Sequence, residues 1–443
     1  MSDEIREFDL GPYVPHSVGV GNAGKLWVTS DSKCVIRVNP ASPGQISYAN
    51  HSLMPQLSAG IMQDPHNRAK MWFAAPAPPR AEDPIVEMDT TAGYPLRFFP
   101  LEDDAKAQSI ALETRVTGPV GTPNTVYSLL FAEPEHSYVG ILDIPESGAG
   151  QIQRMTVEPS TWLWDVAVTS DEAQRNHTYW LTGQKRVNNP PRTVNGLFRR
   201  DPGQHTWERI TPPRGNEQKP FYVKADTEAV WVTFAGTGMN QVGRFDLRRG
   251  TWITRDLGTA VPQQLTFTPN DEVWVTSSVG IHVFDRAMSD EGFLVRLPNG
   301  GTAKGICVDR DGNIWYTNPT NKTLGRYLTS LAARGAPSLL GRTQVVSHTD
   351  TAVHAKEHVD RPLVAEYVAN GRPVPGIPLT CRVKAEGATF GDGTQERIIL
   401  TDQRGRVALP AVYAGEIEEE AILSVGLGDT EPHAATRLHI NPA

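Results

Sequence analysis

Cysteine is scarce in this chain of 443 residues, which contains only Cys34, Cys307 and Cys381. Three widely separated cysteines are too few for a disulfide framework or a four-cysteine zinc site. The first ten residues, MSDEIREFDL, are acidic and contain no apolar core of the kind found in a secretory signal peptide. These observations favour a cytoplasmic protein, or one that is exported without a classical signal peptide.

Two other features are missing. No run of residues approaches the 18 or more consecutive apolar positions of a membrane-spanning helix, so we expect no membrane span. The 50 acidic residues outnumber the 42 basic ones, which gives a formal net charge of -8. Binding to nucleic-acid phosphates requires clustered lysine and arginine, so the charge balance argues against a nucleic-acid partner.

What the sequence does contain is an internal repeat. A short apolar strand ending in a small polar residue recurs as KLWVTS, KMWFAA, YSLLFAE, TYWLTG, AVWVTF, EVWVTS and NIWYTN. Its anchor positions are 41 to 58 residues apart and are Trp27, Trp72, Leu130, Trp180, Trp231, Trp274 and Trp315. A period of about 40–50 residues with several strands in each unit is typical of a β-propeller. The tryptophans are expected in the core, between neighbouring blades.

The ends of the repeat predict how the propeller closes. After the seventh unit no fourth strand follows, whereas the N-terminal segment Glu4–Leu10, EIREFDL, has the pattern of one. A strand contributed by the other end of the chain would leave no blade with an open edge. The sequence therefore predicts an all-β chain that begins with a seven-bladed β-propeller over residues 1–335.

The C-terminal part has a different pattern. The Ala-, Gly- and Pro-rich segment Leu331–Gly341 is expected to be a linker that few contacts cross. Seven short strands with turn residues between them follow over residues 343–443, which is typical of an immunoglobulin-like (Ig-like) β-sandwich. The segments NGRPVPGIPLTCRV and ILTDQRGRVALPAVYAG resemble the bacterial Ig-like modules of intimin- and invasin-type adhesins. Such a module is a possible site for a protein partner.

Candidate ligand-binding residues lie at the ends of the strands that line the predicted central channel. Innermost strands begin near His16 in the first blade, Trp164 in the fourth, Gln263 in the sixth and Lys304 in the seventh. Further candidates lie at the ends of second strands: Ser30 in the first blade, Phe234 in the fifth, Ser277 in the sixth and Asn318 in the seventh. We expect all eight side chains at the channel mouth. The alternative is that they cap the channel together with water.

Two segments between second and third strands are longer than their counterparts. They are Pro76–Pro84 and Gly183–Asn195, and both are expected to be loops on the face of the ring that carries His16 and Lys304. Loops on a rigid scaffold often hold binding residues. The alternative is that the fold simply tolerates insertions at these two positions.

The last repeat, AKGICVDRDGNIWYTNPTNKTLGRY, resembles the repeat of streptogramin B lyases. That resemblance covers residues 1 to about 330 and implies the propeller fold. It also implies an enzyme that opens a cyclic depsipeptide antibiotic by elimination at its ester bond, with two histidines, a glutamate and bound magnesium. At the matching positions this chain has Lys304, Asn318 and Thr320 instead. In the first blade the histidine is present as His16, but its partner is Ser30. Glu133 is the one glutamate left at the position after the aromatic strand.

These replacements decide the expected function. An elimination needs a general base and stabilisation of the developing enolate, and asparagine and threonine cannot act as the base. Magnesium prefers carboxylate oxygens, which the matched positions of the first, sixth and seventh blades do not offer. We therefore expect no metal or other cofactor, no assignable catalytic residue, and a recognition protein that binds a polar small molecule, glycan or peptide at the channel mouth. The alternative is a C–O lyase acting on a cyclic depsipeptide or related substrate, in which a desolvated Lys304 is the base.

Overall fold

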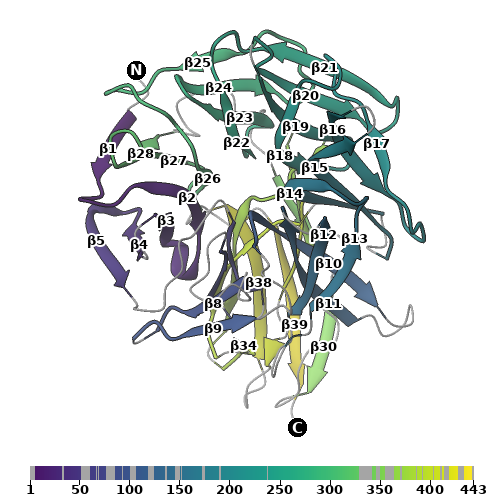
Figure 1. The fold of residues 1–443 in the computed structure, drawn as a ribbon. Helices are drawn as coiled ribbons and strands as arrows, with labels where there is room; N and C mark the ends of the chain where they lie inside the picture. The colour runs from purple at the N-terminus through teal and green to yellow at the C-terminus, as the bar shows by residue number, and fades with distance from the viewer. Residues whose placement is uncertain are drawn as a thin grey trace.

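The computed structural model describes residues 5–441, apart from intervals of which the longest are 51–59, 76–84, 100–105, 118–123, 329–341, 355–363 and 428–433. The described chain is all-β, as predicted, with one short 3-10 helix, η1 (Asn22–Gly24), and no α-helix among the described residues. Between residues 5 and 327 the strands form repeated four-stranded antiparallel sheets around a central opening (Figure 1).

Each of these sheets uses consecutive strands from the inside of the ring to its rim. The first sheet consists of β2 (Pro15–Val20), β3 (Leu26–Ser30), β4 (Cys34–Asn39) and β5 (Ser42–Asn50). The second consists of β6 (Ile61–Gln63), β7 (Lys70–Ala74), β8 (Ile85–Asp89) and β9 (Leu96–Phe99). The third consists of β10 (Ser109–Thr117), β11 (Asn124–Glu133), β12 (Tyr138–Ile144) and β13 (Ile152–Thr156). The fourth and fifth consist of β14 (Thr161–Ser170), β15 (His177–Asn188), β16 (Pro191–Arg200) and β17 (Glu208–Ile210); and β18 (Lys219–Ala225), β19 (Ala229–Ala235), β20 (Gln241–Asp246) and β21 (Thr251–Asp256). The sixth consists of β22 (Pro262–Phe267), β23 (Glu272–Ser277), β24 (Gly280–Asp285) and β25 (Phe293–Val295).

The last sheet of the ring joins the two ends of the repeat region. It consists of β26 (Ile306–Val308), β27 (Ile314–Asn318), β28 (Thr323–Tyr327) and β1 (Ile5–Asp9), with β1 antiparallel to β28. Glu7 on β1 fixes this pairing, because its carboxylate accepts hydrogen bonds from Asn318 Nδ2 at 3.0 Å and Tyr316 OH at 3.2 Å. The predicted closure by the N-terminal strand is confirmed.

The recurrent tryptophans form the cores between neighbouring sheets. All six indoles are at most 1% exposed: Trp27, Trp72, Trp180, Trp231, Trp274 and Trp315. Four of them also donate a hydrogen bond from the indole nitrogen to an acceptor in their own sheet. The acceptor lies on the first strand, on the second strand or in the turn after the first strand. Trp315 is an example, with 2.7 Å between its Nε1 and Asp309 Oδ2. Burial and hydrogen bonding together explain why this aromatic position marks the repeat.

The C-terminal strands form separate sheets. One contains β29 (Arg342–Val345), β31 (Val364–Ala369), β32 (Arg372–Pro373) and β36 (Arg406–Ala408), and a second contains β30 (Asp350–His354), β39 (Ala434–Asn441), β38 (Glu419–Leu427), β33 (Pro378–Lys384) and β35 (Glu396–Leu400). A two-stranded ribbon consists of β34 (Thr389–Phe390) and β37 (Val412–Tyr413). Buried residues of both larger sheets, such as Tyr367, Leu379 and Val425, belong to one core.

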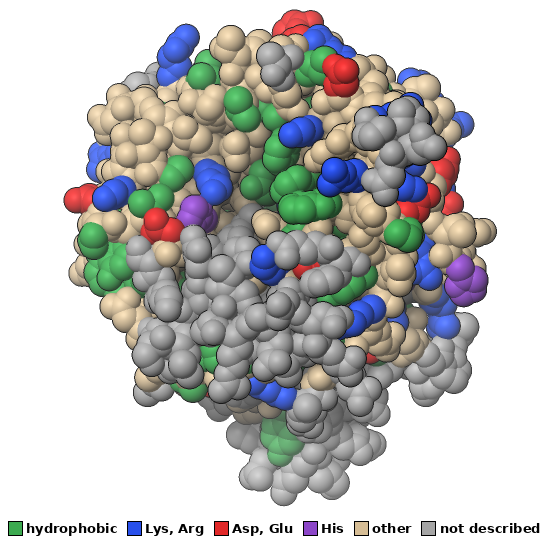
Figure 2. All heavy atoms as spheres, viewed as in Figure 1, with side chains coloured by type: hydrophobic (Ala, Val, Ile, Leu, Met, Phe, Trp, Pro, Cys, Tyr) green, Lys and Arg blue, Asp and Glu red, His purple; other side chains and the backbone are tan. Residues whose placement is uncertain are grey.

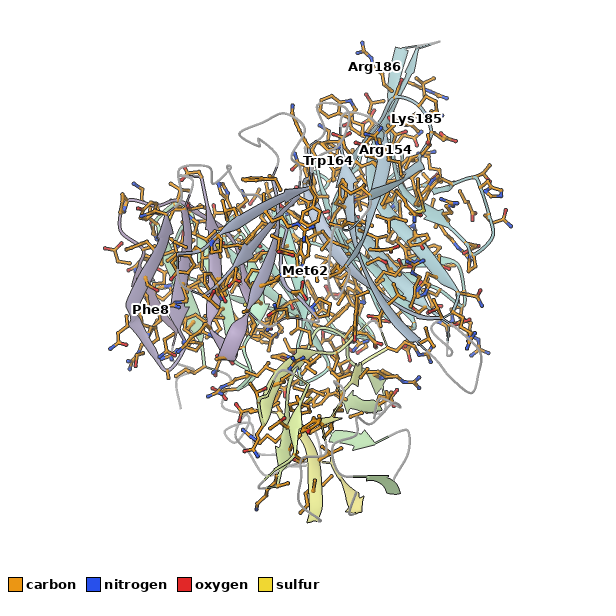
Figure 3. The ribbon with its side chains drawn as sticks, turned by 90° about the horizontal axis from the view of Figure 1, so that it is seen from below. Phe8, Met62, Arg154, Trp164, Lys185 and Arg186 are labelled. Carbon is orange, nitrogen blue, oxygen red and sulfur yellow. The ribbon has the colours of Figure 1, made fainter. Side chains whose placement is uncertain are left out.

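The C-terminal sheets lie against one face of the ring (Figure 3). Tyr367 OH donates a buried hydrogen bond of 3.2 Å to Pro269 O, and Arg404 Nη1 donates one of 3.2 Å to Ser170 O. Apolar residues of the fifth and sixth sheets, Trp231 and Phe267 among them, share a core with the C-terminal sheets. The expectation that few contacts join the two parts is therefore wrong. The composition of a linker does not reveal whether the modules it joins have complementary surfaces.

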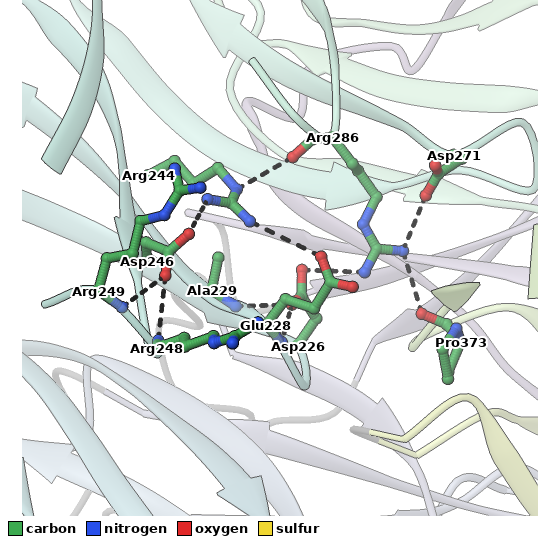
Figure 4. Close-up of polar contacts among 10 residues, drawn as sticks. All are labelled: Asp226, Glu228, Ala229, Arg244, Asp246, Arg248, Arg249, Asp271, Arg286 and Pro373. Carbon is green, nitrogen blue, oxygen red and sulfur yellow. Dashed lines mark hydrogen bonds and ion pairs between the residues drawn. The ribbon is translucent and has the colours of Figure 1, made fainter. Parts of the chain in front are cut away.

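A buried arginine strengthens this contact (Figure 4). Arg286 forms ion pairs with Asp226 at 2.9 Å and Asp271 at 3.3 Å, and its Nη1 donates to Pro373 O of the C-terminal part at 3.2 Å. All three charged side chains are at most 5% exposed. Their partners within the fold compensate for the loss of hydration, so the arginine belongs to the docking surface.

Deletion of residues 1–10 should expose the edge of β28 and remove the Glu7 contacts. We expect aggregation or loss of a cooperative melting transition, because a long unpaired strand edge is left. Calorimetry of the full chain and the truncated chain tests this. A truncated chain that melts like the full one would show that β1 is dispensable.

Asn318→Ala should destabilise the protein by about 1–3 kcal/mol, since Asn318 is fully buried and bonded to both Glu7 and Gly300 O. Asn299→Ala is the matched control, because Asn299 donates to the same carboxylate from an exposed position. The control should remain within about 0.5 kcal/mol of the parent. Equal denaturant midpoints for the two variants would contradict this role of Asn318.

Arg286→Met should destabilise by about 3–5 kcal/mol, because it leaves two buried carboxylates without their cation. It should also separate the melting of the C-terminal sheets from that of the ring. Arg248→Met is the control, since Arg248 is exposed and its backbone N–H makes the only contact drawn for it in Figure 4. A single unshifted transition in Arg286→Met would mean that the network does not couple the two parts.

Candidate functional site

The candidate site is formed by irregularities in the innermost strands. The pairing of four of these strands with their neighbours shifts register at the same place, between Pro15 and Val18, Leu163 and Asp165, Pro220 and Val223, and Pro262 and Leu265. Such β-bulges redirect side chains and are common beside functional sites. The residues within them are His16, Ser17, Trp164, Phe221, Tyr222, Gln263 and Gln264. We use the term channel mouth for His16, Trp164, Phe221, Gln263 and Lys304.

Two bases meet in the channel mouth. Lys304, immediately before β26, approaches His16 of β2, with 2.7 Å between Lys304 Nζ and His16 Nδ1. Both side chains are half-buried. Burial, together with the Lys304 charge, lowers the pKa of His16 to about 4, against the opposing influence of Asp31. Burial also lowers the pKa of Lys304.

The protonation of the pair follows from these shifts. His16 is neutral near pH 7, and the Lys304 ammonium can only donate, so Nδ1 of His16 is the acceptor and Nε2 carries the ring proton. Two ammonium N–H bonds of Lys304 and the Nε2–H of His16 remain for other acceptors. A pair of adjacent donors with a cation is suited to a carboxylate or another anionic oxygen group.

Threonine hydroxyls fix the backbone on both sides of the pair. Thr317 Oγ1 donates to His16 O at 3.0 Å and accepts from Gly305 N at 2.7 Å. The single hydroxyl proton of Thr276 is shared between Lys304 O, at 2.6 Å from Oγ1, and Gln264 O, at 2.9 Å. Each hydroxyl thus connects the innermost strands of two neighbouring sheets directly at the residues of the channel mouth.

The fourth and fifth sheets contribute aromatic side chains. The rings of Trp164 and Phe221 lie 5.6 Å apart, and both residues are half-buried. Figure 3 shows Trp164 on the face of the ring opposite the C-terminal strands. Seen from that face, hydrophobic side chains gather beside the centre, with Lys and Arg side chains around them (Figure 2). Gln263 lies half-buried in the bulge of β22.

Four of the predicted site residues lie elsewhere. Ser30 and Ser277 are fully buried, and their hydroxyls donate to Cys34 O at 2.7 Å and Gly280 O at 3.0 Å within the turns that follow. Asn318 is buried against Glu7, and Phe234 is buried with its ring 5.3 Å from that of Trp252. The structure therefore does not bring these four side chains to the channel mouth.

The residues present do not fit a magnesium site like the one that the lyase resemblance implies. Lys304, at the position matched to a lyase histidine, has an ammonium group that cannot act as a ligand to a cation. Glu133 is fully buried and accepts a hydrogen bond from Lys106 N at 3.0 Å. Among the described residues no group of three or more His, Cys, Asp or Glu side chains could hold a metal ion.

The structure changes two parts of the predicted site. Phe221 replaces Phe234 as the aromatic neighbour of Trp164, and the repeated threonine, not the residue after it, contacts the backbone of the mouth. The sequence did contain a signal for the threonine, because Thr follows the anchor by two positions in five of the seven units. The predicted loop Gly183–Asn195 is largely an extension of the strands β15 and β16, which pair as far as Asn188 and Pro191. Pro76–Pro84 lies outside the described residues.

Comparisons with known proteins support the propeller fold. No protein-family model and no curated protein matches this chain. Among solved structures it is similar to the extracellular domain of BT3049 from B. thetaiotaomicron, described as a hybrid two-component system, with 11% identity, a TM-score of 0.52 and coverage of 99% of this chain and 58% of that one. It is also similar to the WD40 β-propeller domain of Doa1 (8% identity, TM-score 0.54, 74% of this chain and 98% of that one). A third similar structure is YCF48 bound to D1 peptide (12% identity, TM-score 0.50, 74% and 97%).

At these identities the similarity shows the fold alone, and the chain spans little more than half the length of the BT3049 domain. Within the described residues there is no helix with the length and hydrophobicity needed to span a bilayer. The chain therefore has a β-propeller fold, which it shares with proteins whose descriptions differ from one another.

Proposed function

We propose that this protein is a non-catalytic recognition protein that binds a small anionic or polar ligand at the channel mouth. In this proposal the four-stranded sheets form a closed ring of seven blades, and residues 343–443 form an Ig-like sandwich. The observation that carries it is the contact between Lys304 and His16, a half-buried cation beside a neutral histidine.

The energetics favour an anionic acceptor. Partial burial makes the charged form of Lys304 unfavourable, as the lowered pKa indicates. A carboxylate bound between Lys304 and His16 would restore the electrostatic stabilisation that the ammonium loses with its water. Trp164 and Phe221 offer flat apolar surface for the rest of the ligand. An acidic sugar or the C-terminus of a peptide combines these two properties, and one of the similar propeller structures, YCF48, was solved with a peptide bound.

The C-terminal sheets limit access to the ring. Their contacts reach Gly24 in the first sheet, Ser170 in the fourth and Pro269 in the sixth, so they involve blades on all sides of the proposed ring. Ile398 Cδ1 lies only 3.2 Å from the position that a Cβ on Gly24 would occupy. We infer that this module covers one opening of the channel, and that ligands enter from the face with Lys304.

One observation favours the lyase alternative. The lowered pKa of Lys304 makes its neutral amine more accessible near neutral pH, and a neutral amine can remove a proton next to a carbonyl. His16 donates from Nε2 and is the remaining candidate for stabilising an enolate oxygen. The resemblance of residues 1–330 to streptogramin B lyases gives the substrate to test.

Lys304→Met should weaken ligand binding by about 1–3 kcal/mol, because a charge-assisted hydrogen bond is lost. The ligand is first selected from an array of neutral and carboxylated glycans and short peptides, and its affinity is then measured by calorimetry. His16→Ala should weaken the same ligand. Lys384→Met removes an equal charge from the C-terminal module and should leave affinity unchanged.

The dependence on pH separates the two functions. Binding of an anion requires the ammonium, so affinity should fall as pH rises through the lowered pKa of Lys304. Elimination requires the neutral amine, so turnover should rise over that same range. Linear antibiotic would establish the lyase if it increases with pH, has the same mass as the cyclic substrate, and is separated from it by chromatography through its new carboxylate and double bond. If no ligand on the array is sensitive to Lys304→Met, the recognition proposal is wrong.

A further inference from the structure

We propose that the projecting ends of β15 and β16, with Trp162 of β14, form a second binding surface that accepts an extended acidic peptide from a partner protein. The surface projects from the fourth sheet on the face opposite the C-terminal strands, where Figure 3 shows Lys185 and Arg186. We call it the hairpin surface. It does not include Lys304 or His16.

The charge of the hairpin surface is opposite to that of the whole chain. Residues 184–194, QKRVNNPPRTV, contain Lys185, Arg186 and Arg192 and no acidic residue, although the chain has a net charge of -8. Lys185 forms an ion pair with Glu158. Arg186 and Arg192 are exposed, and neither forms an ion pair with a residue in the described part of the chain. Two guanidinium groups are thus available for carboxylates.

An exposed tryptophan lies beside them. Trp162 is 49% exposed, which is unusual in a chain whose six recurrent tryptophans are at most 1% exposed. Its register partner on β15 is Gln184, and Arg186 is two residues further along and opposite Thr193. Side chains at directly opposed and alternate positions share one face of a sheet, so Trp162, Arg186 and Thr193 lie on the same face. Tryptophan and arginine are the residue types that most often dominate binding energy at interfaces.

The free edge of β16 favours a peptide over other anions. Its pairing with β17 is limited to Leu197–Arg199, so the part from Pro191 to Gly196 has no strand on that side among the described residues. On that side Asn195 is already occupied, because its N–H donates to Asn216 O at 3.3 Å and its C=O accepts from Arg209 Nη2 at 2.7 Å, so the open part of the edge is residues 191–194. Because the ladder alternates, the N–H and C=O of Thr193 point to the same side. An added strand can pair there while its acidic side chains reach Arg186 or Arg192.

The test is fluorescence anisotropy of a labelled twelve-residue peptide of alternating Glu and Val, with the full chain. Arg186→Ala should weaken binding about tenfold. Trp162→Ala should weaken it less, because β15 and β16 lie between β14 and the added strand. Phe293→Ala removes an aromatic side chain of equal exposure, 50%, from the outer strand β25 and should change nothing. Lys304→Met should also change nothing, which separates this surface from the channel mouth.

Two further measurements decide the class of partner. Thr193→Pro removes an outward N–H without removing a ladder bond to β15, so it should weaken the peptide but not an anionic polysaccharide such as hyaluronan. The same peptide with Gln in place of Glu should bind at least tenfold more weakly. The proposal is overturned if the acidic peptide does not bind, if all variants bind it equally, or if hyaluronan displaces it and Thr193→Pro has no effect. Unchanged circular dichroism of each variant confirms that the fold is intact.

Discussion

The position of the candidate site depends on one repeated interaction, the hydrogen bond from a threonine hydroxyl to the innermost strand of the next sheet. Thr182 donates to Phe221 O, Thr276 to Lys304 O and Thr317 to His16 O. The three acceptor residues are the ones whose side chains form much of the channel mouth. A hydroxyl buried with two backbone partners has little freedom, so it sets the direction of the neighbouring side chain. The threonine hydroxyls therefore both connect neighbouring sheets and orient the residues of the candidate site.

The ring is not uniform in this respect. In the second and third sheets the threonine position holds Ala74 and Ala132, which have no hydroxyl. There the connection between the innermost strand and its neighbour relies on backbone bonds such as Ala74 N to Gly60 O at 3.0 Å. The residues that meet at the mouth, Lys304 and His16, come from the part of the ring where the threonine bonds are consecutive. This distribution gives the lysine–histidine pair its fixed geometry.

The sequence was sufficient to predict the scaffold because the scaffold is periodic. Each buried Trp recurs with its strand, and the lack of a fourth strand after Tyr327 pointed to the N-terminal segment. The site was predicted only in part, because the face of a strand to which a side chain points changes from each residue to the next. Thr29 and Ser30 point to opposite faces of β3, and the family resemblance directed attention to the second of them. Ser30, Ser277 and Asn318 serve turns or the closing strand instead.

The sequence could place distant segments near one another, but it could not give the direct contacts between their side chains. His16 and Lys304 are 288 residues apart, and only the closure of the ring brings them to 2.7 Å. Likewise, nothing in the composition of residues 331–341 indicates that Arg286 will find Pro373, or that Tyr367 will bond to Pro269. Such contacts depend on the shapes of two finished surfaces. A linker constrains only the distance between them.

The two proposed surfaces differ in how their charge is maintained, and this difference follows from burial. Arg186 is exposed, so its charge is solvated before a partner binds and the folded protein keeps it without a desolvation cost. Lys304 is half-buried, and burial lowers its pKa, so the folded protein keeps the cation at a cost. The bonds of Thr276 and Thr317 to the flanking backbone prevent the chain from relaxing to relieve that cost. A bound anion would offset that cost, which makes the half-buried pair, and not the exposed arginine, the better candidate for tight binding of a small ligand.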